Sequence, residues 1–306
     1  MRSFLISAIC AAALFTLAAQ PAVAEPPVVV ASKIDTEGAL LGNMILSILA
    51  GRGISVRNRL QLGPTNIVRA AILAGQIDIY PEYTGNGARF FRMETDPVWR
   101  NRERGYAEIA KLDRTANQLV WLTPAPANNT WVIAVRKDLA VRNHLATMSD
   151  FARYVNGGGN IKLAASAEFV ESPSALPAFE ASYGFRLSDR QLLTLSGGNT
   201  SATLRAAAEG MSGVNAAMAY GTDGAIAALN LVALDDDKGA QIVYAPAPVI
   251  REAVLRQYPQ IAGLLDPVFA SLTLATLQRL NAKIAVDGED AGAVAVSYLK
   301  SKHFLP

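Results

Sequence analysis

Three aromatic side chains lie at or beside the ends of expected strands, although they come from distant parts of the chain: Tyr83, Trp131 and Tyr220. A quaternary ammonium group cannot donate a hydrogen bond, so a protein holds it with aromatic faces that each contribute about 0.5–2 kcal/mol. Converging rings would therefore suit a quaternary ammonium ligand. Spacing alone favours a simpler alternative, in which these rings pack in the core or line the wall of a cleft.

The residue types that could do catalysis form no clear constellation. His144 and His303 belong to no metal-spaced pair and lie beside no evident nucleophile. Glu82, Glu168 and Asp223 fall near expected strand ends, so a carboxylate pair is conceivable. Helix capping and ion pairing explain these three carboxylates equally well. We therefore expect no catalytic residues, no metal and no cofactor, and a protein that is not an enzyme.

The first 24 residues have the layout of a secretory signal peptide. Arg2 supplies a positive charge, an apolar run follows, and Ala22-Val23-Ala24 ends the segment with an A-x-A cleavage site. The apolar run of about 15 residues is shorter than the ~20 that a spanning helix needs, which favours cleavage over a membrane anchor. Cleavage after Ala24 would remove Cys10, the only cysteine, and would exclude disulfides and thiol chemistry.

The size and charge of the remaining chain fit an ordinary globular protein. Removal of 24 of the 306 residues would leave 282, which is enough for two lobes with a sizeable core. The formal net charge is only +2, and acidic and basic residues are mixed along the chain. The basic stretch from Arg100 to Arg104 is interrupted by Glu103 and lacks an aromatic stacking pattern. Nucleic acid is therefore not an expected partner.

Short apolar runs alternate with segments of helical period in the first part of the mature chain. Strands are expected near 28–30, 54–62 and 77–80, with helices near 40–49 and 67–72. Strands that alternate with helices of about three turns indicate βαβ units around a mainly parallel sheet.

The alternation resumes beyond Pro124 and Pro126, and the chain ends in a helix-rich tail. The further strands that we expect are near 131–135, 161–165, 192–195, 215–220, 231–234 and 241–245. Two α/β lobes with a cleft between them are therefore plausible. In such folds a ligand lies where the carboxyl ends of strands face a crevice.

Three stretches of the chain form distinctive motifs. The longest is Gly75-Gln76-Ile77-Asp78-Ile79-Tyr80-Pro81-Glu82-Tyr83-Thr84-Gly85, of the form G-x-I-D-[LI]-Y-P-E-Y-T-G. Residues 32–37 have the form S-K-x-x-T-E, and residues 220–224 have the form Y-x-T-D-G. In this order they resemble the motifs of the glycine betaine/choline/carnitine-binding proteins of ABC importers, and most closely those of the OsmF/YehZ subfamily. The resemblance spans essentially the whole mature chain.

This resemblance implies an α/β, two-lobed periplasmic-binding-protein fold of type II. Each lobe would be a mainly parallel sheet flanked by helices, with a hinged ligand cleft between the lobes. Lobe I would comprise residues 25–128 plus 225–306, and lobe II residues 129–224.

The resemblance also implies a function. The protein would be the periplasmic substrate-binding component of an ABC importer for osmoprotectants, such as glycine betaine or choline. Its partners would be the small-molecule solute and an inner-membrane permease with cytoplasmic ATPase subunits, and it would be a monomer. Two alternatives stay open: a binding protein for another small zwitterion or amino acid, and a module that presents its ligand to a membrane sensor.

Matching motifs carry the family's ligand-binding roles onto particular residues. Tyr83 and Tyr220 match tyrosines of an aromatic cage, and Trp131 stands where the family usually has tyrosine. Lys33 and Thr84 match positions that help to hold the polar end of the ligand. The expected ligand-binding set is completed by Thr222, Asp223 and Glu168.

Two positions depart from the family pattern. Ser172 stands where better-known betaine binders have an arginine that grips the ligand carboxylate, and Leu204 falls near a further cage tyrosine. Losing a charge-assisted contact removes about 1.5–3 kcal/mol. We therefore expect low affinity for glycine betaine, unless Arg205 or Arg69 replaces the missing arginine.

Overall fold

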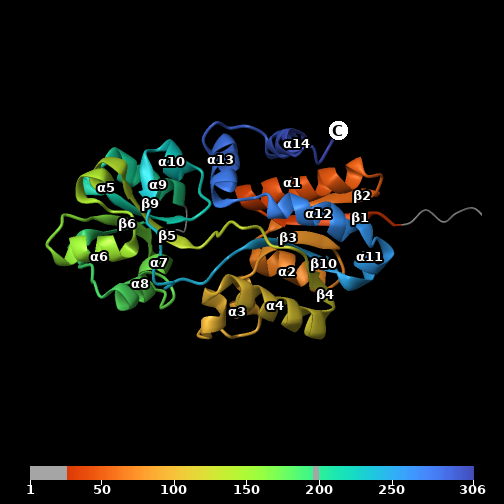
Figure 1. The fold of residues 1–306 in the computed structure, drawn as a ribbon, viewed down its shortest axis with the longest axis horizontal. Helices are drawn as coiled ribbons and strands as arrows, with labels where there is room; N and C mark the ends of the chain where they lie inside the picture. Colours follow the sequence, from red (N-terminus) through yellow and green to blue (C-terminus); the bar gives the residue numbers. More distant parts are fainter. Residues whose placement is uncertain (1–25, 196–199) are drawn as a thin grey trace, which may run out of the picture.

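The fold was analysed in a computed structural model, which describes residues 26–195 and 200–306. The predicted signal peptide and its cleavage site after Ala24 lie outside the described residues. The chain forms two α/β lobes that lie side by side along the long axis of the molecule (Figure 1). The fold class predicted from the sequence is confirmed.

The first lobe is built on a five-stranded sheet. Its strands follow the order β2 (Val56–Gly63), β1 (Val28–Lys33), β3 (Ile79–Tyr83), β10 (Pro246–Arg251) and β4 (Leu119–Trp121). Strands β2, β1 and β3 are parallel to one another, whereas β10 runs antiparallel to both of its neighbours. The sheet is therefore mainly parallel, with one reversed strand that returns from the other lobe.

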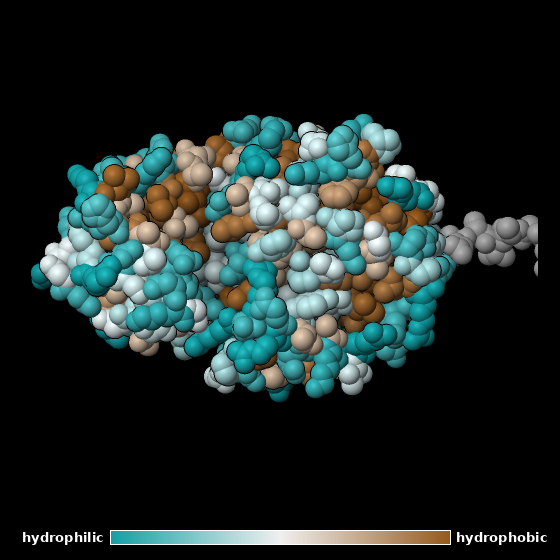
Figure 2. All heavy atoms as spheres, in the orientation of Figure 1, coloured by the Kyte–Doolittle hydropathy of each residue, from teal (hydrophilic) through white to brown (hydrophobic). Residues whose placement is uncertain are grey.

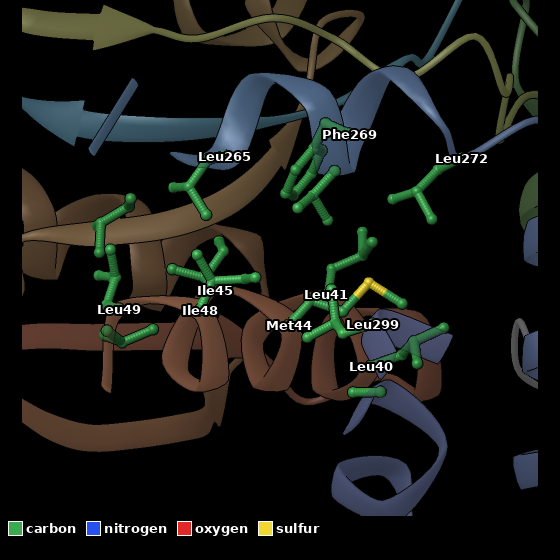
Figure 3. Close-up of a cluster of buried hydrophobic side chains, with 14 of the residues drawn as sticks. Leu40, Leu41, Met44, Ile45, Ile48, Leu49, Leu265, Phe269, Leu272 and Leu299 are labelled. Carbon is green, nitrogen blue, oxygen red and sulfur yellow. The ribbon is translucent and has the colours of Figure 1, made fainter. Parts of the chain in front are cut away.

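Helices cover both faces of this sheet. One face carries α1 (Thr36–Gly51), α11 (Glu252–Gln257), α12 (Gln260–Ala270), α13 (Leu274–Ala285) and α14 (Ala291–Ser301), and the other carries α2 (Thr65–Leu73), α3 (Asn86–Phe90), η1 (Pro97–Arg100) and α4 (Arg102–Asn117) (Figure 1). Helix α1 begins where the Asp35 carboxylate accepts a hydrogen bond from the Gly38 backbone N–H at 2.7 Å. Its apolar residues, including Leu41 and Ile45, pack against Leu265 and Phe269 of α12 (Figure 3).

The second lobe repeats this plan. Its strands follow the order β7 (Leu192–Leu195), β6 (Leu163–Ser166), β8 (Ala216–Tyr220), β5 (Trp131–Arg136) and β9 (Leu231–Ala233). Strand β5 alone runs against the other four. The helices of this lobe are α5 (Lys137–Asn143), α6 (Met148–Asn156), α7 (Ala167–Glu171), α8 (Leu176–Tyr183), η2 (Asp189–Gln191), α9 (Thr200–Glu209), η3 (Met211–Gly213) and α10 (Ala225–Ala228).

The predicted return to the first lobe at residue 225 is too early. Strand β9 pairs with β5 of the second sheet, and Ile226 and Leu231 are buried in the apolar cluster on that sheet. Residues 225–240 therefore belong with the second lobe, because β9 covers what would otherwise be a free edge of β5. The stretch 241–245, predicted as a strand, lies outside the named strands and leads into β10.

Two antiparallel chain segments connect the lobes. Thr130 donates a side-chain hydrogen bond to the Ile242 carbonyl at 2.7 Å, and the Asn129 backbone N–H donates to the Tyr244 carbonyl at 2.9 Å. The Tyr244 backbone N–H in turn donates to Asn128 Oδ1 at 2.8 Å. The two segments are thus held together where the lobes meet, which is the geometry of a hinge.

No single helix among the described residues is long and apolar enough to cross a membrane, although the sharply bent pair α12 and α13 passes that test jointly by length and composition.

A buried ion pair joins α2 to α4, two of the helices that cover the face of the first sheet opposite α1. Arg69 of α2 donates to Asp113 of α4, with 2.8 Å between Nη1 and Oδ2. Trp121 Nε1 and Asn117 Nδ2 each donate to the same carboxylate at 2.7 Å. Asp113 is fully buried and Arg69 nearly so. Removal of one partner would leave an uncompensated charge in the interior.

We predict that Asp113→Ala lowers the free energy of unfolding by about 3–5 kcal/mol, because the Arg69 guanidinium would stay buried without a counter-charge. Urea unfolding at pH 7 measures this change. Glu209→Ala is the control, since it removes an exposed pair with Arg205 and should change the free energy by less than about 0.5 kcal/mol. Equal losses in the two variants would contradict the prediction.

Candidate ligand-binding cleft

A cavity of about 750 Å³ lies where the two lobes meet. The first lobe lines it with residues that follow β1 and β3, and the second lobe lines it with residues from β5, α7, α9 and the segment after β8. The space-filling view shows an indentation between the two halves of the molecule (Figure 2). Both lobes therefore line one partly open cavity, as expected for a ligand between them.

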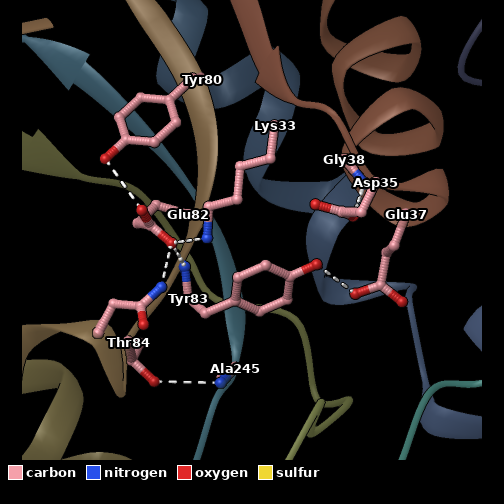
Figure 4. A network of polar contacts seen from close by, with 10 residues as sticks. Lys33, Asp35, Glu37, Gly38, Tyr80, Glu82, Tyr83, Thr84 and Ala245 are labelled. Carbon is pink, nitrogen blue, oxygen red and sulfur yellow. Dashed lines mark hydrogen bonds and ion pairs between the residues drawn. The ribbon is translucent and has the colours of Figure 1, made fainter. Parts of the chain in front are cut away.

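The fully buried carboxylate of Glu82 organises the first-lobe side of the cavity (Figure 4). It forms an ion pair with Lys33 and accepts hydrogen bonds from the Tyr83 backbone N–H at 2.7 Å and from Asn86 Nδ2 at 2.7 Å. The Tyr80 hydroxyl donates to its second oxygen at 3.2 Å. Because its oxygens already have four donors, Glu82 positions its neighbours and is not available to a ligand.

Lys33 lines the cavity as expected, but its ammonium group already forms an ion pair within the protein. Its ammonium group pairs with Glu82 and also lies 4.4 Å from the centroid of the Tyr83 ring. The residue is only 5% exposed. Lys33 therefore covers one face of Tyr83 and leaves the rest of that ring to the cavity.

Glu37 is a second buried carboxylate at the cavity, and sequence reasoning did not assign it a role. The Tyr83 hydroxyl donates to its Oε1 at 2.7 Å, and Asn281 Nδ2 of α13 donates to its Oε2 at 2.6 Å. Burial raises the pKa of Glu37, although hydrogen bonds from Thr222, Tyr83 and Asn281 act in the opposite direction. Glu37 thus joins the first lobe to the segment that follows β8 of the second.

The second-lobe wall of the cavity is aromatic. Trp131 and Tyr220 are direct cross-strand partners on β5 and β8, and their rings stack with centroids 4.3 Å apart. Phe169 meets the edge of Trp131 at 5.4 Å. A cation cannot lie between two rings that are already stacked, so Trp131 and Tyr220 form one combined surface. Burial raises the pKa of Tyr220 far above its usual range, so its hydroxyl stays neutral.

The structure brings most of the predicted ligand-binding residues together. Seven of them line the cavity: Lys33, Tyr83, Trp131, Glu168, Tyr220, Thr222 and Asp223. Thr84 is not among the lining residues, because its hydroxyl donates to the Val243 carbonyl and accepts from the Ala245 backbone N–H, both at 3.1 Å. Thr84 therefore holds the segment that leads into β10 and does not face the cavity.

The positions that depart from the family pattern also lie at the cavity. Ser172 and Leu204 both line it, whereas Arg69 and Arg205 do not. Tyr244, from the returning hinge segment, adds a ring that sequence reasoning missed. The only signal for Tyr244 was its place in the crossing segment, and no motif marks it.

The lining is rich in carboxylates. Five acidic residues face two basic ones among the described residues that line the cavity: Asp35, Glu37, Glu94, Glu168 and Asp223 against Lys33 and Arg89. Burial raises the pKa of Asp223, whose carboxylate accepts the Tyr220 backbone N–H at 2.8 Å. Aromatic faces beside an excess of carboxylates suit the positive end of a small organic molecule.

Comparisons with known proteins agree with this geometry. A model of the OpuAC family, described as the substrate-binding domain of ABC-type glycine betaine transport systems, matches residues 26–301. The chain is 60% identical over 282 residues to the glycine betaine-binding protein YehZ of Escherichia coli K12, which covers 92% of each chain. It is 30% identical to a glycine-betaine-binding protein of Pseudomonas aeruginosa, over 98% of this chain and 96% of that protein.

A solved structure gives the same result for the fold. The apo structure of YehZ from Escherichia coli superposes with a TM-score of 0.84 at 60% identity, and the match covers 92% of this chain and 100% of that one. The type of fold and the family inferred from the motifs are therefore both confirmed.

We predict that Glu37→Gln removes a pH-dependent loss of stability. A carboxyl whose folded-state pKa is raised above 4.5 binds its proton more tightly in the folded state, so the native protein loses stability as the pH rises from about 4.5 towards that raised pKa. The unfolding free energy of Glu37→Gln minus that of the native protein should therefore increase as the pH rises through this range. Above the raised pKa the difference should stay constant.

Urea unfolding at a series of pH values between 4 and 8 measures this difference. Glu209→Gln, at an exposed carboxylate, is the control and should show a flat difference. A flat or reversed slope for Glu37→Gln would contradict the prediction.

Proposed function

The chain belongs to the family of substrate-binding domains of ABC-type glycine betaine transport systems, and from this premise we propose that it captures a quaternary ammonium solute in the cavity between its lobes. The solute would be glycine betaine or a choline-like compatible solute, bound with low affinity. The family consists of transport binding proteins, so the chemistry of the cavity is recognition, with no bond made or broken.

The observation that carries this proposal is the pairing of aromatic surfaces from both lobes with an excess of carboxylates. Tyr83 approaches from the first lobe, and the stacked Trp131 and Tyr220 approach from the second. Each ring contributes about 0.5–2 kcal/mol to the binding of a methylated ammonium group, and more when water is excluded. Glu168 and Asp223 add a negative potential on the same side.

Closure of the lobes around the hinge would follow from this arrangement. A ligand shifts the equilibrium between open and closed states only by the difference between its binding free energies for the two states. A solute that touches Tyr83 alone contacts one lobe, whereas a solute between Tyr83 and Tyr220 contacts both. Binding energy from the second contact would therefore stabilise the closed form, which is the form that an importer accepts.

Low affinity follows from the residues at two positions of the lining. Ser172 has no positive charge for a carboxylate, and Leu204 has no aromatic face for a cation. Both side chains can contact a ligand but supply neither of the strong interactions. The Pseudomonas aeruginosa and Escherichia coli relatives are named for glycine betaine, and we extend that ligand to this chain on the strength of the cavity.

The proposal includes a setting for the protein. It would be exported to the periplasm with its signal peptide cleaved after Ala24, and it would act as a monomer. Residues 129–241 would form the mobile second lobe. The closed, loaded form would dock on an inner-membrane permease whose ATPase subunits lie in the cytoplasm.

We predict that Tyr83→Ala and Tyr220→Ala each weaken the binding of glycine betaine and of choline by roughly tenfold, the loss expected when about 1.4 kcal/mol of ring contact is removed. Tyr220→Phe should be milder, since the aromatic face remains. Isothermal titration calorimetry on the mature protein measures these affinities.

Tyr154→Ala is the matched control, because it removes a half-buried ring of the second lobe outside the cavity. Its affinity for both ligands should equal that of the native protein. Unchanged affinity in both Tyr83→Ala and Tyr220→Ala would eliminate the aromatic site.

A further inference from the structure

Arg89 is a cation at the cavity that has no counter-charge among the described residues. Of the two basic residues that line the cavity among those described, Lys33 is paired with Glu82 and buried. Arg89 lies on the short helix α3, is exposed, and forms neither an ion pair nor a side-chain hydrogen bond within residues 26–195 and 200–306. Its five N–H donors are therefore free to bind an anionic group.

The other arginines considered from the sequence are engaged elsewhere. Arg69 binds Asp113 with both terminal nitrogens in the interior of the first lobe. Arg205 is exposed on α9, with its Nε 4.0 Å from Glu209. Neither lines the cavity. A carboxylate in the cavity therefore has Arg89 as its available partner.

Arg89 also acts on another residue of the cavity wall. Burial raises the pKa of the Tyr244 hydroxyl, Glu168 raises it further, and Arg89 acts in the opposite direction. Arg89 comes from the first lobe and Glu168 from the second, so charged groups of both lobes act on the Tyr244 hydroxyl, and the Glu82 carboxylate of the first lobe raises its pKa as well.

We infer that Arg89 receives the carboxylate of the ligand and thereby selects zwitterionic solutes over simple cations. The inference rests on the proposed function, because it names the residue that would bind the carboxylate of the proposed ligand. Five carboxylates line the same cavity, so a ligand carboxylate placed there is repelled unless a cation faces it. The planar guanidinium offers two parallel N–H donors to a carboxylate, a geometry that a lysine lacks.

The position of Arg89 also gives the ligand a direction. The carboxylate would point towards α3 of the first lobe, and the trimethylammonium group would lie on the Trp131 and Tyr220 surface of the second. A zwitterion then bridges the lobes through its two charged ends. A choline-like cation would contact the aromatic rings of both lobes, Tyr83 included, and would gain nothing from Arg89.

The test compares two ligands in one set of variants. Calorimetry with glycine betaine and with choline is run on the native protein and on Arg89→Gln, Arg89→Lys and Arg205→Gln. Arg89→Gln should weaken glycine betaine by about three- to tenfold, a loss below that of a buried charged contact because the side chain is exposed. Arg89→Lys should lose less, because it keeps the charge. Arg205→Gln should bind both ligands as the native protein does.

The affinity for choline is the readout that separates recognition from structural damage. Choline binding should change by less than twofold in Arg89→Gln, because choline has no carboxylate. Equal weakening of both ligands, or unchanged affinity of Arg89→Gln for glycine betaine, would overturn the inference and leave the proposed function intact. A native protein that binds neither ligand would overturn both together.

Discussion

Burial of the Glu82 carboxylate is the constraint on which the ligand-binding side of the first lobe depends. A carboxylate removed from water is costly unless donors surround it. Here Lys33, Tyr80, Asn86 and the Tyr83 backbone supply them. This requirement ties the end of β1 to β3 and to the start of α3. It also fixes where the Tyr83 ring stands, because the donor N–H belongs to the same residue.

The same constraint sets the electrostatic character of the cavity. The ion pair with Glu82 neutralises the charge of Lys33. Among the described residues that line the cavity, five carboxylates then face one unpaired cation, so the cavity attracts positive groups. The aromatic surface of Trp131 and Tyr220 then gives this attraction a location on the second lobe. Arg89 is left as the complement for a negative group. In the proposed complex, Arg89 of the first lobe would bind the negative end of a zwitterion and the Trp131 and Tyr220 surface of the second lobe would bind its positive end.

Local patterns predicted the features that local physics determines. The alternation of apolar runs and helical periods predicted two α/β lobes and a buried strand near 77–80. The strand in the structure is β3 (Ile79–Tyr83), so Tyr83 is its last residue and does not follow it. The lobe boundary was predicted too early because α10 and β9 are too short to show where they pair. The contact between Asn281 and Glu37 joins residues that are 244 positions apart, and no local signal marks it. The stacking of Trp131 on Tyr220 likewise depends on strand register, which one sequence does not give.

The most direct test of this account is a crystal structure of the mature protein grown with saturating glycine betaine. The account predicts the ligand in the cavity between the lobes, in contact with both. Its trimethylammonium group should lie within about 6 Å of the Tyr220 and Trp131 ring centroids, the range of cation–π attraction. Glycine betaine bound to one lobe alone, or outside this cavity, would contradict the account.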